Sequence, residues 1–197
     1  MNRPQSDEDL MVAYAKGNYH AFKILYQRHK SGLYRYLLRQ CGRAEDAQEL
    51  FQDIWTNLTR ARERYEVRAK FATYLYRLAH NRVIDHYRRQ AHNPVDQWQR
   101  SPGDEGGETI EDFAEINGEP VEDRVHRKRL VQHLLGLIDE LPPPQREVFL
   151  LREEGGFSVE EIAEVTGVNA ETAKSRLRYA VAKLRKGLRQ ELSHESE

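Results

Sequence analysis

Hydrophobic residues recur at the three-to-four-residue spacing of an α-helix along most of the chain. The spacing marks two groups of four segments, and residues 93–123 between the groups lack it. No run of alternating β-branched residues bounded by turns occurs, so the pattern predicts an all-α fold. The expected helices span residues 7–16, 19–40, 44–62 and 69–91 in the first group, and residues 124–140, 143–153, 158–166 and 170–192 in the second.

Residues that favour helix ends stand at several of these limits. Gly42 follows the second segment, where a left-handed C-cap residue is expected. The prolines at 142–144 break one helix and can open the next. Ser158 and Glu161 have the spacing of a capping box, and Gly167 ends the helix that this box begins.

The stretch between the two groups has a different composition. Residues 93–124 hold ten acidic residues and two arginines, a net charge of −8, together with three prolines and four glycines. Few large aliphatic residues are present, so the stretch buries too little apolar surface to offset the entropy lost on ordering. The sequence therefore predicts two small helical domains, residues 1–92 and 124–197, joined by a flexible acidic linker at residues 93–123.

Charge is segregated along the chain although the whole chain nets only −1. With residues 93–124 at −8, the remainder nets +7. Residues 59–89 and residues 170–190 each net +6. Two basic segments on either side of an acidic one favour a polyanionic partner such as nucleic acid.

Composition and motifs exclude several other classes of protein. The mean hydropathy is −0.84, and neither a membrane-length apolar run nor a signal peptide is present, so we expect a cytoplasmic protein. The single cysteine, Cys41, rules out a CxxC pair and is expected to be a small buried residue. No Gly-rich phosphate loop, HExxH or GxSxG motif occurs. We therefore expect no catalytic residues, no metal, no cofactor and no small-molecule substrate.

Residues 157–188 have the layout of a helix-turn-helix. Ile162 and Ala163 point inward from a short first helix, Gly167 permits a sharp turn, Val168 fills the corner and Asn169 caps the second helix. The inner face of that second helix consists of Ala173, Leu177, Ala180, Val181 and Leu184. An ordinary helical hairpin with a solvated basic face is the alternative.

The outer face of the second helix combines short polar side chains with long basic ones. Such residues at the start of a helix suit base edges in the major groove and the phosphates beside them. The face therefore predicts contact with duplex DNA. Its residues are Glu171, Thr172, Lys174, Ser175, Arg176, Arg178 and Tyr179.

A second basic face lies on the helix expected at 69–91. Its cations alternate with Tyr74, Tyr76 and Tyr87, and a basic stretch at 64–70 precedes it. Cations beside aromatic rings suit single-stranded DNA, whose phosphates and unstacked bases need both. Aromatic residues at helical spacing are also common in a core, so this signal is weak alone.

Four segments, taken together and in order, resemble the extracytoplasmic-function (ECF, group IV) sigma factors of bacterial RNA polymerase, within the sigma-70 family. They are DEDLMVAYAKGNYHAFKILYQRH, AEDAQELFQDIWTNL, FATYLYRLAHNRVIDHYRR and LPPPQREVFLLREEGGFSVEEIAEVTGVNAETAKSRLRYAVAKL. The resemblance covers nearly all of the chain outside the linker. It implies a sigma-2 domain that binds core polymerase and recognises and melts the −10 element, and a sigma-4 domain whose helix-turn-helix reads the −35 element.

The resemblance also implies roles for single residues in the first domain. The contact with the −10 element is expected from Arg64, Lys70, Asn81, Arg82, Asp85, Arg88 and Arg89. The contact with the clamp coiled coil of the polymerase is expected from Asp46, Glu49, Leu50, Gln52, Asp53 and Trp55. Three of these carboxylates follow helical spacing, which predicts an acidic stripe with Leu50, Gln52 and Trp55 exposed beside it. A solvated acidic face is the alternative.

Some positions depart from the family pattern. Trp55 replaces the usual Phe, Leu58 stands where Trp is common, Ala173 replaces Val, and residues 169–171 replace P-x-G. The last two changes lie at the DNA edge, so the preferred −35 sequence cannot be borrowed from relatives. The partners implied are core polymerase, through its clamp coiled coil and flap, promoter DNA and an anti-sigma factor. A stand-alone helix-turn-helix regulator is the alternative function.

Overall fold

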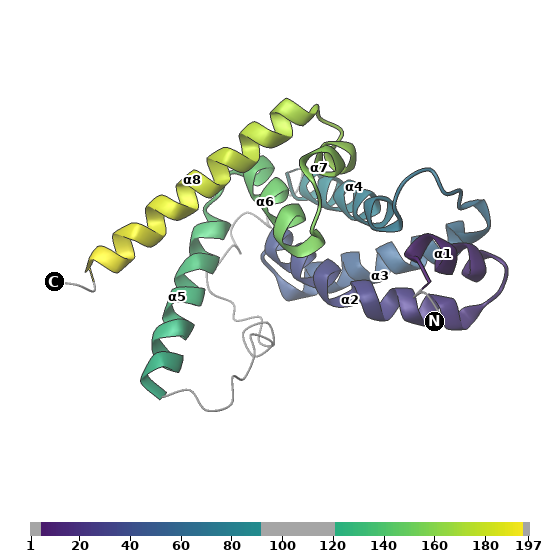
Figure 1. Ribbon diagram of the computed structural model, residues 1–197, viewed down its shortest axis with the longest axis horizontal. Helices are drawn as coiled ribbons and strands as arrows, with labels where there is room; N and C mark the ends of the chain where they lie inside the picture. The colour runs from purple at the N-terminus through teal and green to yellow at the C-terminus, as the bar shows by residue number, and fades with distance from the viewer. Residues whose placement is uncertain (1–4, 92–120, 195–197) are drawn as a thin grey trace.

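The computed structural model describes residues 5–91 and 121–194, and within them every regular element is helical (Figure 1). This confirms the predicted all-α fold. The helices are α1 (Asp7–Ala15), α2 (Tyr19–Cys41), α3 (Ala44–Ala61), a 3-10 turn η1 (Arg62–Arg64), α4 (Phe71–Ala91), α5 (Val121–Asp139), α6 (Pro143–Gly155), α7 (Val159–Thr166) and α8 (Ala170–His194).

The limits of most helices agree with the sequence pattern to within two residues. α5 begins at Val121, so the last three residues of the predicted linker are helical. The rest of that linker lies outside the described residues. In the described residues no helix is long and apolar enough to cross a membrane. We call α1 to α4 the N-terminal unit and α5 to α8 the C-terminal unit.

The core of the N-terminal unit forms around α2, which contacts α1, α3 and α4. Leu33 and Leu37 of α2, Leu58 of α3 and Leu75 of α4 are fully buried. Removing one such side chain typically costs about 2–5 kcal/mol, because both the transfer free energy and the packing around it are lost. The apolar face of each of these helices is therefore the face that it packs into this core.

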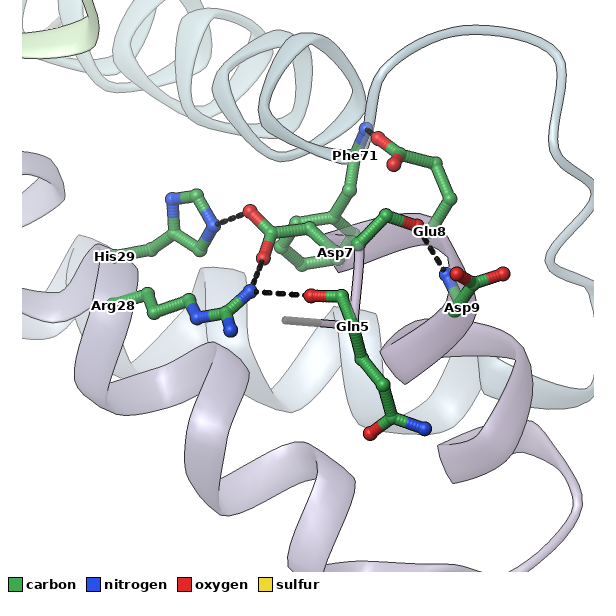
Figure 2. Close-up of polar contacts among 8 residues, drawn as sticks. Gln5, Asp7, Glu8, Asp9, Arg28, His29 and Phe71 are labelled. Atoms are coloured by element: carbon green, nitrogen blue, oxygen red, sulfur yellow. Dashed lines mark hydrogen bonds and ion pairs between the residues drawn. The ribbon is translucent and has the colours of Figure 1, made fainter. Parts of the chain in front are cut away.

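Helix α1 joins α2 to α4 through a polar cluster (Figure 2). The Asp7 carboxylate accepts a hydrogen bond from Arg28 at 2.5 Å, and its other oxygen lies 2.6 Å from Nε2 of His29. The Glu8 carboxylate accepts the backbone N–H of Phe71 at 2.7 Å. A carboxylate at the first turn of a helix satisfies a free amide and interacts well with the helix dipole. Glu8 thus caps α4 from 63 residues away.

In the C-terminal unit, α6, α7 and α8 pack around one another, and α5 lies against α8. The last contact is close at Gly187, where an added Cβ would lie 2.5 Å from Leu137. A side chain at this position would therefore require the Leu137 side chain to move. The far ends of α5 and α8 extend away from the N-terminal unit (Figure 1).

The two units pack directly against each other, α2 on α6 and α4 on α7 (Figure 1). The ring of Tyr76 on α4 meets that of Phe157 edge-on, with centroids 5.0 Å apart. A Cβ at Gly32 of α2 would lie 3.1 Å from the carbonyl oxygen of Glu154. The buried apolar side chains of both units form one continuous cluster. The sequence did not predict this docking.

Candidate nucleic-acid interface

The helix-turn-helix of α7 and α8 has the predicted local geometry. The Ser158 hydroxyl accepts the N–H of Glu161, while the Glu161 carboxylate accepts the N–H of Ser158, so the capping box is complete. Gly167 has a φ of 68°, the left-handed conformation that glycine adopts without strain. The Asn169 side chain caps α8 by accepting the N–H of Thr172 at 2.7 Å. These contacts hold the two helices at a fixed turn.

The face of α8 predicted to touch DNA is accessible. Ala173 and Ala180 are buried on the opposite side of the helix, as is Leu184. The Arg178 guanidinium lies 5.2 Å from the centroid of the Tyr179 ring, so its position is supported by stacking. Four of the seven predicted residues are exposed, namely Glu171, Lys174, Arg178 and Tyr179, whereas Thr172, Ser175 and Arg176 are half-buried.

The second predicted DNA face, on α4 and the segment before it, is more varied. The side chains of Arg64, Lys70, Asn81, Arg88 and Arg89 are exposed. Arg82 and Asp85 are half-buried, and Asp85 lies 3.8 Å from Arg88. Lys70 is paired with Glu161 of α7 at 2.7 Å, so a carboxylate of the C-terminal unit already neutralises one of the predicted cations.

The tyrosines of α4 do not lie with these cations on an open face. Tyr76 is 3% exposed and packs into the contact between the units. Tyr87 is partly buried and donates its hydroxyl to the carbonyl of Gln40. Tyr74 is partly buried against Tyr65. The prediction of stacking rings for single-stranded DNA is therefore wrong for Tyr76, because its ring is needed in the core.

The acidic face predicted on α3 is present in part. Glu49, Gln52 and Asp53 are exposed. Asp46 is half-buried, with its carboxylate 3.7 Å from His86 and 4.0 Å from Arg43. Glu49, Gln52 and Asp53 can therefore contact solvent or a partner directly, whereas Asp46 also connects α3 to α4.

The predicted exposure of Leu50 and Trp55 is wrong. Leu50 is 3% and Trp55 6% exposed. At about 100° per residue, these two side chains are directed away from Glu49 and toward α2 and α4. Trp55 packs edge-on against Tyr26 and Phe22, with ring centroids 5.0 and 5.7 Å apart. Both residues stabilise the fold and cannot contact a partner directly.

The sequence analysis did not predict an aromatic edge, formed by Phe51, Tyr34 and Tyr26, beside the acidic face of α3. Phe51 of α3 is partly buried, and its ring lies 5.9 Å from that of Tyr34 and 6.1 Å from that of Tyr26, centroid to centroid. The helical period places Phe51 at the border of the buried face, so this signal was available in the sequence. The edge supplies the apolar surface expected from Leu50 and Trp55.

The single cysteine, Cys41, lies at the end of α2. Cys41 is half-buried, and burial, with the charge of Asp46 nearby, raises the pKa of its thiol to about 12. The thiol therefore stays protonated at neutral pH, and a protonated thiol is a poor nucleophile. Across residues 5–91 and 121–194 no group of three or more His, Cys, Asp or Glu side chains is placed to hold a metal ion.

Comparison with known proteins assigns both units to one family. The model "Sigma-70 region 2" matches residues 25–93, and the model "Sigma-70, region 4" matches residues 132–184. Together the two matches cover more than half of the chain. The chain belongs to the sigma-70 family. Every residue predicted to contact DNA or polymerase lies within one of the two matched segments.

Relatives of this sigma factor match along most of their length. It is 29% identical to "RNA polymerase sigma factor CarQ" of Myxococcus xanthus, over 89% of this chain and 93% of that protein. It is 27% identical to "ECF RNA polymerase sigma factor SigM" of Mycobacterium tuberculosis, over 91% of this chain and 83% of that protein. For "ECF RNA polymerase sigma factor SigW" of Bacillus subtilis the identity is 27%, over 88% and 92%.

Solved structures share the fold of this sigma factor. The structure of CnrH in complex with the cytosolic domain of CnrY has a TM-score of 0.65 at 22% identity, covering 94% of this chain and 99% of that one. The sigma factor RpoE of Bartonella quintana, in complex with the anti-sigma factor NepR, has a TM-score of 0.64 at 19% identity, covering 85% and 96%. The all-α arrangement of two helical units is therefore common to these proteins.

Proposed function

We propose that this ECF sigma factor binds bacterial core RNA polymerase and directs it to a defined set of promoters, while the polymerase performs the chemistry. The observation that carries the proposal is the pair of exposed basic faces, one in each matched segment. The face on α8 follows a capped helix-turn-helix, and the face on α4 belongs to the other unit. In this proposal the chain itself has no enzymatic activity, because the polymerase performs the chemistry.

The C-terminal unit is proposed to read the −35 element as duplex DNA. Lys174 and Arg178 are exposed one turn apart on α8, where long cations reach phosphates beside the major groove. Glu171 and Tyr179 are exposed on the same helix and can reach base edges. Thr172, Ser175 and Arg176 are half-buried, and the Ser175 hydroxyl donates to the carbonyl of Thr172 at 3.0 Å.

The N-terminal unit is proposed to capture the −10 element once its bases leave the stack. Arg88 and Arg89 at the end of α4 supply exposed positive charge for the strand. Asn81 is exposed on the same helix and carries the donors and acceptors that an unpaired base requires. Arg64, Lys70, Arg82 and Asp85 complete the proposed surface. Interactions made only with open DNA would favour opening, because duplex DNA cannot form them.

Core polymerase is proposed to dock on α3. Glu49 and Asp53 present negative charge, and the Phe51 edge presents apolar surface next to it. This combination suits a basic helical partner such as the clamp coiled coil, since charge steers the encounter and aromatic burial supplies affinity. The flap of the polymerase is proposed to hold the C-terminal unit.

An anti-sigma factor is proposed to control this chain. The solved relatives CnrH and RpoE are described as complexes with CnrY and with the anti-sigma factor NepR. An inhibitor that covers Glu49, Phe51 and Asp53 would compete with core polymerase for one surface. We therefore expect anti-sigma factor and core to bind in mutual exclusion, measured by co-elution. A stable complex of all three would contradict this.

Run-off transcription tests the proposed function. Core polymerase with this chain should transcribe a promoter set that core alone does not, including the promoter upstream of the chain's own gene. The matched control is the Arg88→Ala, Arg89→Ala variant, which should bind core but transcribe poorly. The stand-alone regulator predicts the opposite pattern, with tight, specific promoter binding by the chain without core.

A further inference from the structure

An aromatic ring at the junction of α1 and α2 is open to solvent. Tyr19 is 68% exposed, the highest value for a large apolar side chain among the described residues. The ring is nevertheless held in place. The Arg62 guanidinium lies 5.9 Å from its centroid, and the Tyr14 ring, which is 2% exposed, meets it edge-on at 6.3 Å. Tyr19 therefore presents a fixed ring and not a loose one.

Arg62 connects this ring to the segment proposed to contact the −10 element. Its guanidinium also lies 5.5 Å from the Tyr14 ring, so two aromatic contacts position it. Its ion pair with Glu63 is weak, because the two groups are 3.8 Å apart and the Glu63 side chain is 77% exposed. Turn η1, which Arg62 begins and Arg64 ends, contacts α1 and precedes α4 (Figure 1). The Tyr19 ring thus lies at the border of the proposed −10 surface.

The surroundings of the ring are polar. Lys16, Asn18 and His20, the neighbours of Tyr19 in the same turn, are all exposed. A protein partner needs a contiguous apolar patch at the centre of its contact, and a single ring among polar side chains does not supply one. An unstacked base needs a flat ring, and its phosphate needs a cation. The pair of Tyr19 and Arg62 therefore favours single-stranded nucleic acid over a protein.

The proposed −10 surface otherwise lacks an open tyrosine ring. On α4, Tyr76 is buried, and Tyr74 and Tyr87 are half-buried. The exposed residues of that helix can hold phosphates and base edges, but stacking requires a free aromatic face. Tyr19 supplies this face from a different part of the N-terminal unit.

We propose that Tyr19 and Arg62 form a stacking site for one unpaired base of the open strand, next to the bases held by α4. Arg62 supports the ring and donates to a phosphate of the same strand. The inference rests on the proposed function, because it requires open promoter DNA. Stacking accepts any base, so the site adds affinity for the open strand without choosing its sequence. Duplex DNA cannot use the site, since its bases are already stacked on one another.

The first measurement is the affinity of core polymerase with the full chain for a promoter fragment that carries a pre-opened bubble. Tyr19→Ala should weaken binding about fivefold or more without changing its salt dependence, and Tyr19→Phe should restore the parental affinity because the ring remains. Arg62→Ala should weaken binding and flatten the slope of log affinity against log salt by about 0.7, the value for one phosphate of a single strand. The matched control is His20→Ala, which removes the adjacent exposed ring and should change neither quantity.

The second measurement locates the base. The fluorescent base 2-aminopurine, whose emission is quenched by stacking, replaces successive bases of the open strand in the same fragment. Tyr19→Ala should raise the emission at one place in the series and leave the other positions unchanged. Binding to a duplex fragment with the −35 element should be equal for all variants. The unfolding midpoint of Tyr19→Ala should match that of the parent, because most of the ring is already in water.

Three results would overturn the stacking site. Tyr19→Ala could bind the bubble as tightly as the parent, or it could weaken binding to bubble and duplex equally. It could also weaken binding to core polymerase without DNA, which would place the ring against a protein. Bubble binding does not require initiation, so a failure of the proposed function is recognised separately, as parental holoenzyme that binds the bubble but gives no run-off from any promoter.

Discussion

Lys174 and Arg178 should set part of the salt dependence of promoter binding. Both are exposed on α8, about 6 Å apart along the helix axis, and the Tyr179 ring supports the Arg178 guanidinium. Each phosphate contact adds about 0.9 to the slope of log affinity against log salt. Between about 50 and 200 mM salt, a loss of 0.9 in slope reduces the salt-induced weakening by about 3.5-fold, and a loss of both contacts reduces it by about 12-fold.

The assay is a salt titration of promoter binding by core polymerase with each variant. Lys174→Ala and Arg178→Ala should each weaken binding and flatten the slope by about one unit, and the double variant by about two. Lys186→Ala is the matched control, since this exposed cation lies about 18 Å from Lys174 and about 12 Å from Arg178 along the axis of α8, and on another side of the helix. If both single variants keep the parental affinity and slope, the assignment of the recognition face is wrong.

Three other substitutions test the remaining surfaces. Asp53→Lys should weaken core binding about tenfold or more by charge reversal, whereas Glu63→Lys, at an exposed carboxylate outside α3, should not. If the two variants bind core with equal affinity in a fluorescence titration, the proposed docking face on α3 is wrong. Trp55→Ala should lower the free energy of unfolding by about 3–5 kcal/mol because its ring is buried, and an unchanged denaturant midpoint would show that the ring carries no packing. Replacing residues 104–115 with an uncharged Gly/Ser stretch of equal length should leave core binding intact but alter the ratio of abortive to full-length transcripts; an equal ratio would indicate a passive tether.

The sequence was sufficient where one chain segment determines its own structure. The apolar period predicted each helix, the Ser158–Glu161 capping box predicted the start of α7, and Gly167 predicted the turn between α7 and α8. These features depend on backbone hydrogen bonds and dihedral preferences within a few residues. The accessible face of α8 followed, because its small inner residues identify the buried side.

Prediction failed where a partner helix decides burial. Leu50 and Trp55 belong to a motif associated with a partner, but within this chain they face α2 and α4. The docking of the units was hidden for the same reason. Nothing local in the sequence indicates that Glu147 of α6 and His80 of α4 lie together, with Nδ1 of His80 2.5 Å from the Glu147 carboxylate. Periodicity gives the face of a helix and not the identity of what covers it.

The cap that Glu8 provides for α4 has a consequence for building hybrid sigma factors. The segment before α4 carries Arg64 and Lys70, and the Tyr65 ring within it packs against Phe71 and Tyr74. Because Glu8 accepts the N–H of Phe71, the first turn of α4 depends on a residue of α1. If residues 62–91 alone were transplanted into a host that lacks a carboxylate at the position of Glu8, the N–H of Phe71 would be left without its cap. If α4 recognises the −10 element as proposed, an exchange of that specificity between family members should carry α1 together with α4.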